Sequence, residues 1–129
     1  MDVSKSVVVI EDDASMSQAM ARMLRVSGFI PVMFSSAEEL LESDEQDGAP
    51  LCMIIDVQLP GLSGFALRDR LHAAGRLPPV IFVTAFDNAS TRSLAEHPRT
   101  VTFLTKPFSG QALMEALRRV CASAQAHPN

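Results

Sequence analysis

The apolar run Leu51–Ile55, which stops at Asp56, constrains the fold of this chain more than any other feature. Five consecutive apolar residues are typical of a strand that is buried on both faces, as in a parallel sheet. The turn residues Pro60 and Gly61 follow shortly afterwards. Open α/β sheets bind their ligands at the carboxyl ends of the strands. Asp56 is therefore the first candidate functional residue.

Four other apolar runs of strand length alternate with segments that have helical patterns. The predicted strands are 7–10, 30–34, 51–55, 80–83 and 100–104. Pro31 near the start of the second strand suggests that this strand lies at a sheet edge. The runs lack the polar alternation of an antiparallel sheet, so the sequence predicts an α/β fold with a five-stranded parallel sheet and helices on both faces.

The helical segments differ in the strength of their signals. One face of the first helix is predicted to consist of Met16, Ala19, Met20, Met23 and Leu24, and one face of the last helix of Leu113, Ala116, Leu117, Val120, Cys121 and Ala124. Ser36 with Glu39 three residues later forms a capping box that opens a second helix. A further helix is expected over about 63–74 and ends at Gly75. Residues 42–47 are expected to form an acidic surface loop.

The segment 88–96 is the weakest helix candidate. Leu94 is its only large apolar residue, and its Ser and Thr residues compete for backbone hydrogen bonds. Pro98 disfavours helical geometry at His97. We expect a short, mobile helix of at most about two turns at ~3.6 residues per turn.

Composition narrows the possible functions. The chain has 129 residues, enough for one domain, which we expect at 1–124 with a tail or the start of a linker at 125–129. The formal charge of −4 argues against direct nucleic-acid binding. No apolar run approaches the roughly 20 residues of a membrane helix, and the first residues lack a signal peptide, so a cytoplasmic location is expected. Cys52 and Cys121 are interpreted as buried apolar residues.

Four of the five predicted strands end in polar groups, namely Glu11 and Asp12, Asp56, Thr84, and Lys106. The carboxyl ends of parallel strands meet along one sheet edge, so these residues are expected to converge. Carboxylates there would repel one another by about 4 kcal/mol per pair at ~4 Å. A hard divalent cation with oxygen ligands, most simply Mg²⁺, would offset this repulsion, and Lys106 supplies a second positive charge.

Each of these residues also has a simpler explanation when it is taken alone. Asp13 is expected to cap the first helix rather than bind metal, Asp56 fits a turn, and Thr84 fits a strand end. Lys106 fits an ordinary surface lysine, although the only other lysine is Lys5. A compact ammonium suits a phosphoryl oxygen. The ordered combination indicates a functional site.

The ordered motifs resemble the receiver domain of two-component response regulators over essentially the whole chain. They are Glu11-Asp12, Asp56 in Asp-Val-Gln-Leu-Pro-Gly-Leu-Ser-Gly, Thr84-Ala85 and Lys106-Pro107-Phe108. The resemblance implies a flavodoxin-like, doubly wound sheet with strand order 2-1-3-4-5. The stretch 34–41 is similar to the branch whose longer members carry a helix-turn-helix output domain.

The resemblance implies a phosphoacceptor signalling domain rather than an ordinary enzyme. Asp56 would take a phosphoryl group from a sensor histidine kinase or a phosphotransfer protein, by self-catalysed transfer and with slow dephosphorylation. The implied Mg²⁺ ligands are Glu11, Asp12, Asp56 and the main-chain carbonyl of Gln58. Lys106 would neutralise charge on the transferring group, and a cis Lys106–Pro107 bond is expected.

The resemblance also implies a conformational switch. The Thr84 hydroxyl would bind a phosphoryl oxygen, and Phe103 would move into the space that Thr84 leaves. A homodimer on phosphorylation is possible for such a domain, and no direct contact with nucleic acid or membrane is expected. His97-Pro98 replaces the small Ala-Gly pair common in the family, and Phe86 is a bulky neighbour for the pocket. Both departures lie at positions that belong to the usual signalling face of the family.

Three alternatives remain. An aspartyl-phosphate hydrolase would need a second Asp where Gln58 stands, and usually a cap domain. A flavin-binding domain of similar architecture would be expected to have a hydroxyl-rich phosphate loop, and this chain lacks both that loop and any Trp or Tyr. A degenerate receiver that acts only as a phosphorylation-independent binding module is disfavoured by the complete set of acidic, hydroxyl and lysine residues.

Overall fold

In the computed structural model, five strands and five helices alternate along the described parts of the chain, residues 5–43 and 49–126. The strands are β1 (Ser6–Ile10), β2 (Ile30–Phe34), β3 (Cys52–Asp56), β4 (Val80–Thr84) and β5 (Thr100–Thr105). The helices are α1 (Ala14–Val26), α2 (Ala37–Glu42), α3 (Gly64–Ala73), α4 (Ala89–Ala95) and α5 (Gly110–Ala126). The predicted strands and helices are thus confirmed within a few residues at each end.

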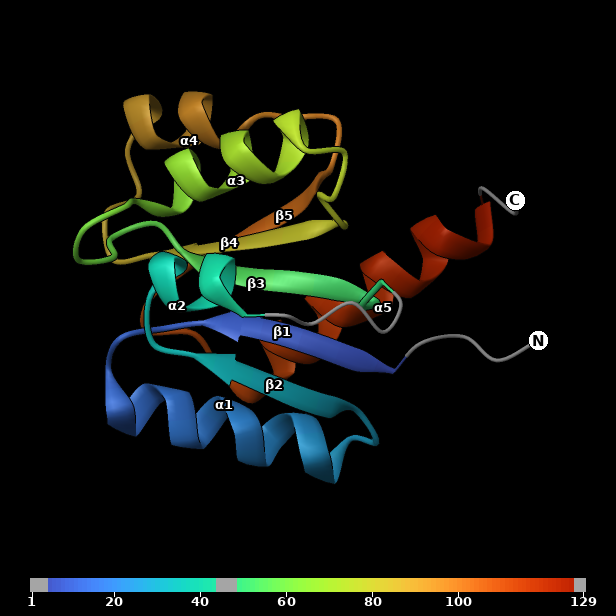
Figure 1. The fold of residues 1–129 in the computed structure, drawn as a ribbon. Helices are drawn as coiled ribbons and strands as arrows, with labels where there is room; N and C mark the ends of the chain where they lie inside the picture. Colours follow the sequence, from blue (N-terminus) through green and yellow to red (C-terminus); the bar gives the residue numbers. More distant parts are fainter. Residues whose placement is uncertain (1–4, 44–48, 127–129) are drawn as a thin grey trace.

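The strands form one sheet of order β2-β1-β3-β4-β5, and every neighbouring pair is parallel. This arrangement confirms the predicted α/β fold and its strand order. β2 is an edge strand, where Pro31 can lack a backbone donor without breaking the centre of the sheet. The carboxyl ends of all five strands point towards the same edge, on the left of Figure 1.

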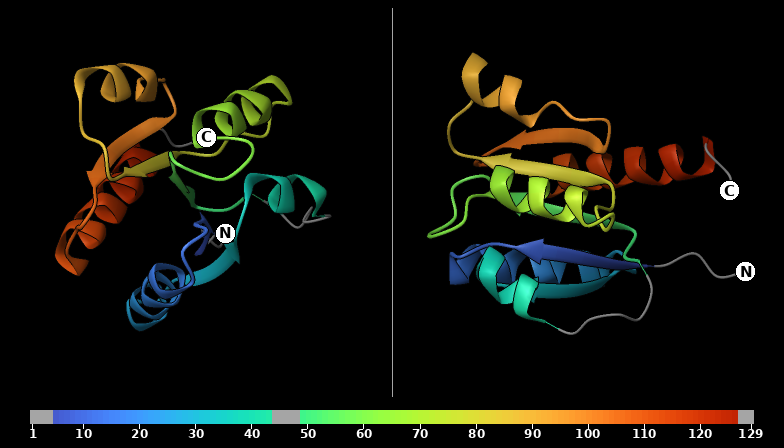
Figure 2. Two further views of the ribbon diagram at one scale, coloured as in Figure 1. Left: turned by 90° about the vertical axis from the view of Figure 1, so that its left-hand side faces the viewer. Right: turned by 45° about the horizontal axis from the view of Figure 1, so that its top comes forward.

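Helices cover both faces of the sheet and divide the core into two clusters (Figure 2). α1 and α5 pack on one face, with Leu24 and Leu117 fully buried there. α2, α3 and α4 lie on the other face, with Leu67 as a fully buried member. β3 and β4 are buried along their whole length, which explains their uninterrupted apolar sequences.

Most of the apolar face predicted for the first helix is confirmed in α1, but the buried face is rotated slightly from the predicted one. Met20, Ala21 and Leu24 are its buried residues, whereas Ala19 is exposed, so the inward placement of Ala19 was wrong. Ala19 lies at the border of the stripe, where a single methyl group adds little burial. Asp13 caps the helix through a 2.8 Å hydrogen bond accepted from the Met16 amide, as expected.

α2 begins with the predicted capping residues. Ser36 Oγ accepts a hydrogen bond from the Glu39 amide at 3.0 Å. The return bond differs slightly from the standard box, because Glu39 Oε1 accepts from the amide of Ser35 rather than from that of Ser36. The expected acidic loop at 42–47 falls mainly on residues outside the described part.

α4 has seven residues, which confirms the predicted limit of about two turns. Its buried residue is Ala95, whereas Leu94 is 54% exposed. A polar contact holds its carboxyl-terminal end instead. Arg68 of α3, only 8% exposed, donates from Nη1 to the Leu94 carbonyl at 2.6 Å. α4 is therefore attached more by hydrogen bonding than by apolar burial.

The two ends of the described fold lie on the same side of the molecule, opposite the carboxyl ends of the strands. β1 starts and α5 finishes on the right of Figure 1, at the amino ends of the strands. α5 continues as far as Ala126, so residues 125 and 126 of the expected tail belong to the helix.

Candidate functional site

Backbone hydrogen bonds at the ends of three strands fix the positions of the main residues of the site. The Glu11 amide donates to the Phe34 carbonyl at 3.0 Å, and the Lys106 amide donates to the Thr84 carbonyl at 2.7 Å. Asp56 is itself paired with Val83 at the end of β3. The parallel ladders therefore bring residues that are far apart in sequence to one edge of the sheet.

Three carboxylates meet at this edge, as predicted. One oxygen each from Glu11, Asp12 and Asp56 lies within 4.8 Å of the others. Glu11 and Asp56 are 3% and 4% exposed, whereas Asp12 is open to solvent. Such a set of oxygen donors fits a hard divalent cation, because Mg²⁺ is bound through one or two carboxylates with water completing its shell.

Lys106 lies between the two buried acids. Its Nζ is 2.9 Å from Glu11 Oε1 and 2.9 Å from Asp56 Oδ2. The Lys106–Pro107 peptide bond is cis, as expected from the family resemblance. The ammonium group thus neutralises part of the negative charge of the pocket, and its two ion pairs show that the ends of β1, β3 and β5 converge.

The acid–base balance of the pocket follows from burial and from these ion pairs. Burial raises the pKa of Glu11, although the hydrogen bonds from Lys106 and from the Asp13 amide oppose the rise. Burial alone would lower the pKa of Lys106, but its hydrogen bonds to Asp56 and Glu11 outweigh that effect and raise it. Lys106 is therefore held in its charged form beside the acids.

Asp56 has a second partner on its other oxygen. Its Oδ1 accepts a hydrogen bond from the Gln58 amide at 2.9 Å, which fixes the start of the loop after β3. Farther along the same loop, the Leu62 amide donates to Glu38 Oε2 of α2 at 2.8 Å, and this bond lowers the pKa of Glu38. The loop is thus held at both ends.

Thr84 is fully buried beside the pocket, and its hydroxyl is occupied. Thr84 Oγ1 donates to Gln58 Oε1 at 2.8 Å and accepts from the Phe86 amide at 3.0 Å. The side chain of Phe86 is 60% exposed, so it does not fill the pocket. The structure therefore places the Thr84 hydroxyl against Gln58.

Phe103 lies outside the carboxylate pocket. It is half-buried in β5 and packs against the cluster under α2, α3 and α4. The guanidinium carbon of Arg92 lies 5.0 Å from the centroid of its ring. Arg92 also forms an ion pair with Asp87, and Asp87 accepts a further hydrogen bond from Thr105 Oγ1 at 3.2 Å. These contacts join the loop after β4 to α4 and β5.

Two residues of the surroundings were missed by sequence reasoning. A Cβ on Gly64 would lie 2.5 Å from the Asp56 carbonyl oxygen, so only glycine fits behind the acid. Arg68 is buried with its guanidinium carbon 5.3 Å from the ring centroid of Phe65 and 5.7 Å from that of Phe82. Gly64 was visible as a glycine just after the turn, whereas nothing in the sequence distinguished Arg68 from the surface arginines.

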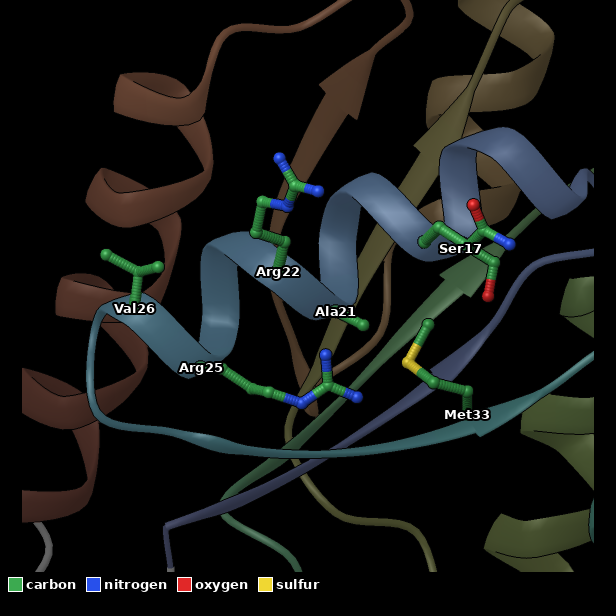
Figure 3. Close-up of a pocket in the computed structure, with 7 residues that line it drawn as sticks. Ser17, Ala21, Arg22, Arg25, Val26 and Met33 are labelled. Atoms are coloured by element: carbon green, nitrogen blue, oxygen red, sulfur yellow. The ribbon is translucent and has the colours of Figure 1, made fainter.

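A surface groove lies apart from this site, between α1 and β2 (Figure 3). Its volume is about 570 Å³, and Met33 of β2 contributes to its wall. Arg22 and Arg25 leave α1 in different directions around it. None of the converging acids nor Lys106 lines this groove.

Comparison with known proteins decides the family. Residues 7–118 match the family described as the response regulator receiver domain. The chain belongs to this family. Its acidic pocket is thus the pocket of a receiver domain. Receiver domains are signalling modules of two-component systems, and they interact with histidine kinases.

Two curated relatives show how this receiver compares with longer proteins. It is 37% identical over 111 residues to nodulation protein W of Bradyrhizobium diazoefficiens, covering 86% of this chain and 48% of that protein. It is 33% identical over 121 residues to the transcriptional regulatory protein FixJ of Azorhizobium caulinodans, covering 92% of this chain and 56% of the relative. The chain thus spans about half the length of these two relatives.

Solved structures agree with the receiver fold. The structure named FixJ-N is 27% identical with a TM-score of 0.78, covering 95% of this chain and 96% of that one. The Vibrio cholerae chemotaxis protein CheY4 is 21% identical with a TM-score of 0.82, covering 92% of this chain and 99% of that one, and supports the fold alone. Among the described residues, no helix is both long and apolar enough to cross a membrane.

Proposed function

We propose that this receiver domain accepts a phosphoryl group on Asp56 from a histidine kinase or a phosphotransfer protein. The observation that carries the proposal is the position of Lys106, whose ammonium lies 2.9 Å from a carboxylate oxygen of Asp56 in a pocket with two other acids. Phosphoryl transfer depends mainly on positioning and charge neutralisation. Lys106 and a cation site beside the Asp56 carboxylate would supply both the positioning and the charge neutralisation.

The proposed cation is Mg²⁺. Glu11, Asp12, Asp56 and the main-chain carbonyl of Gln58 would hold it, with water in the remaining positions. When bound, the ion would neutralise charge on the transferring group and on the acids. Lys106 would then be free to exchange its pairing with Glu11 for a phosphoryl oxygen.

The proposed response to phosphorylation runs through Thr84 and Phe103. The Thr84 hydroxyl would turn to a phosphoryl oxygen, and Phe103 would repack towards the vacated space. Pairing of Thr84 with Thr105 supports this link, because Phe103 lies two residues earlier on β5. NMR of the Phe103 ring with and without a phosphoryl analogue tests it, and an unchanged ring environment would contradict the coupling.

The proposed setting is a two-component response regulator. We propose that the receiver domain comprises residues 1–124, that the last residues of α5 begin the linker after it, and that an output domain accompanies it in the full protein. FixJ, a transcriptional regulatory protein similar to this chain, is nearly twice as long as the matched region. Dimerisation on phosphorylation and a cytoplasmic location are part of the same proposal.

The direct test is phosphorylation by acetyl phosphate, a small phosphodonor, with Mg²⁺ present. Intact-mass spectrometry of the wild type should show one added phosphoryl group, and Asp56→Asn should show none. Glu42→Gln serves as a matched control because this exposed acid lies in α2, away from the cluster.

The same assay separates the proposal from its alternatives. A wild type that is never modified would support a degenerate receiver that works as a binding module. Rapid multiple turnover of a phosphate monoester through Asp56 would instead indicate a hydrolase. The proposed receiver should give a single modification that decays slowly.

A further inference from the structure

We propose that the side chain of Gln58 is a latch that holds Thr84 in the unphosphorylated conformation and competes with the phosphoryl group for the Thr84 hydroxyl. This inference rests on the proposed phosphoacceptor function, since it concerns how Thr84 responds when Asp56 is phosphorylated. It assigns a role to the Gln58 side chain, separate from the role proposed for its main-chain carbonyl. Gln58 acts here as a positioning residue, through Thr84.

The hydrogen bonds of the Thr84 hydroxyl support this proposal. A hydroxyl has one proton to donate, and Thr84 Oγ1 is 2.8 Å from Gln58 Oε1. The other acceptor within reach is the Phe86 carbonyl at 3.5 Å, which is the longer contact. The Phe86 amide donates to Thr84 Oγ1 at 3.0 Å and occupies an acceptor position of the oxygen. Gln58 is therefore the main acceptor of the hydroxyl proton.

The surroundings make this bond specific. Thr84 is 0% exposed, so its hydroxyl is shielded from water although Gln58 itself is an exposed residue. The Gln58 backbone is fixed by its amide bond to Asp56 Oδ1 at 2.9 Å, which places the side chain next to β4. If the buried Thr84 hydroxyl lost this acceptor without gaining another, the conformation would be destabilised by the unsatisfied donor. A phosphoryl oxygen can become that other acceptor only after the bond to Gln58 breaks.

Competition for one proton sets the balance between two conformations. The apparent affinity of a ligand for the protein is its intrinsic affinity multiplied by the fraction of molecules in the binding-competent conformation. Removing the Gln58 acceptor should raise the responsive fraction and therefore tighten binding of a phosphoryl analogue. Because one neutral hydrogen bond contributes modestly to an equilibrium, the expected gain is roughly twofold to tenfold.

The test uses beryllofluoride as the phosphoryl analogue, with saturating Mg²⁺, and measures its affinity by calorimetry. Gln58→Met removes the acceptor and keeps an unbranched side chain of similar length. Gln18→Met is the matched control, because it makes the same substitution on an exposed residue of the groove along α1. We expect tighter binding for Gln58→Met and no change for Gln18→Met.

A second background isolates the latch from other effects of the substitution. In Thr84→Val there is no hydroxyl proton to compete for, so Gln58→Met should no longer change the affinity. In Thr84→Ser, which retains the hydroxyl, the gain should return. A change in charge screening or loop shape would act equally in all three backgrounds.

The possible outcomes separate the two proposals. A wild type that does not bind beryllofluoride overturns the phosphoacceptor function, and the latch with it. A wild type that binds, with the same gain or no gain from Gln58→Met in every background, overturns the latch alone. Weaker binding by Gln58→Met would show that the amide contacts the analogue directly, which also overturns it.

Discussion

At the scale of single residues, Gly64 sets the position of Asp56 from behind. We expect Gly64→Ala to destabilise the fold by about 1–3 kcal/mol, because the new methyl group would force the Asp56 carbonyl or the side chain of Ile55 to shift. Urea unfolding measures this change. Gly110→Ala is the control, since its Cβ meets only the Met23 sulfur, at 3.1 Å. Equal stabilities of the two variants would contradict the prediction.

Asp87 provides a titration test of the contacts around α4. Its pKa is lowered from its ordinary value of 3.8, first by the hydrogen bond from Arg92 and also by the hydrogen bond from Thr105. The pairing therefore stabilises the folded state above pH 3.8, and this contribution is lost as the pH falls through the lowered pKa. We expect Arg92→Gln to raise the pKa of Asp87 back towards 3.8, measured by carboxyl NMR. Arg76→Gln, outside this network, should leave it unchanged.

The residues that the sequence predicted well are those that end apolar runs. Asp56 and Thr84 are the last residues of β3 and β4, Lys106 comes directly after β5, and the parallel sheet then fixes where they meet. Partners formed across loops could not be predicted in this way. The bond from Thr84 to Gln58 depends on how the loop after β3 turns, and local sequence does not encode that geometry.

At the scale of elements, α4 should open more readily than α1. It buries Ala95 and leaves Leu94 exposed, so packing supplies little of its stability. We expect backbone amides over 86–99 to exchange with solvent faster than those of α1. Hydrogen exchange measured by mass spectrometry tests this expectation. Protection of the segment equal to that of α1 in the unphosphorylated protein would contradict it.

The contact from α3 makes this expectation more specific. Arg68→Met would remove the bond to the Leu94 carbonyl, and hydrogen bonds to charged groups contribute about 1.5–3 kcal/mol. Exchange in α4 should then accelerate by roughly tenfold or more, while α1 stays unchanged. Arg70→Met, an exposed arginine on the same helix, is the control.

The helices show which structural features the apolar periodicity of the sequence can predict. It predicted most of the α1 face and the α5 face from Leu113 to Cys121, because a core-facing helix repeats its apolar residues. It wrongly placed Ala19 inward, because one methyl group at the border of a stripe carries little signal. The last predicted member of the α5 face, Ala124, lies outside the residues whose side chains are described. Periodicity predicted the shortness of α4 from weak patterning. It gave no indication of Arg68, because a buried guanidinium between two aromatic rings looks like any other helical arginine in sequence.

At the scale of the whole molecule, the acidic pocket should couple metal binding to folding. We expect Mg²⁺ to raise the melting temperature by mass action, with a stabilisation of about 2.7 kcal/mol at 100 times the dissociation constant. Asp12→Asn, which removes one exposed member of the cluster, should reduce the shift. Without Mg²⁺, Asp56→Asn should melt at or above the wild-type temperature, because one repelling charge is gone. A melting temperature that does not respond to Mg²⁺ would contradict the cation site.

The overall topology was the most predictable property of the chain. Five apolar runs without polar alternation require a parallel sheet covered on both faces, and short connections leave few possible arrangements. The division of the core into two clusters follows from that sheet.

The positions of the first strand and the last helix of the described fold have a practical consequence for measurement. β1 starts and α5 finishes at the amino ends of the strands, whereas the acidic pocket lies at their carboxyl ends. A surface tether or a fluorophore attached through either end would therefore leave the pocket facing the solution. Single molecules immobilised in this way could be supplied with kinase, phosphodonor or Mg²⁺ in turn, without the support obstructing access to Asp56.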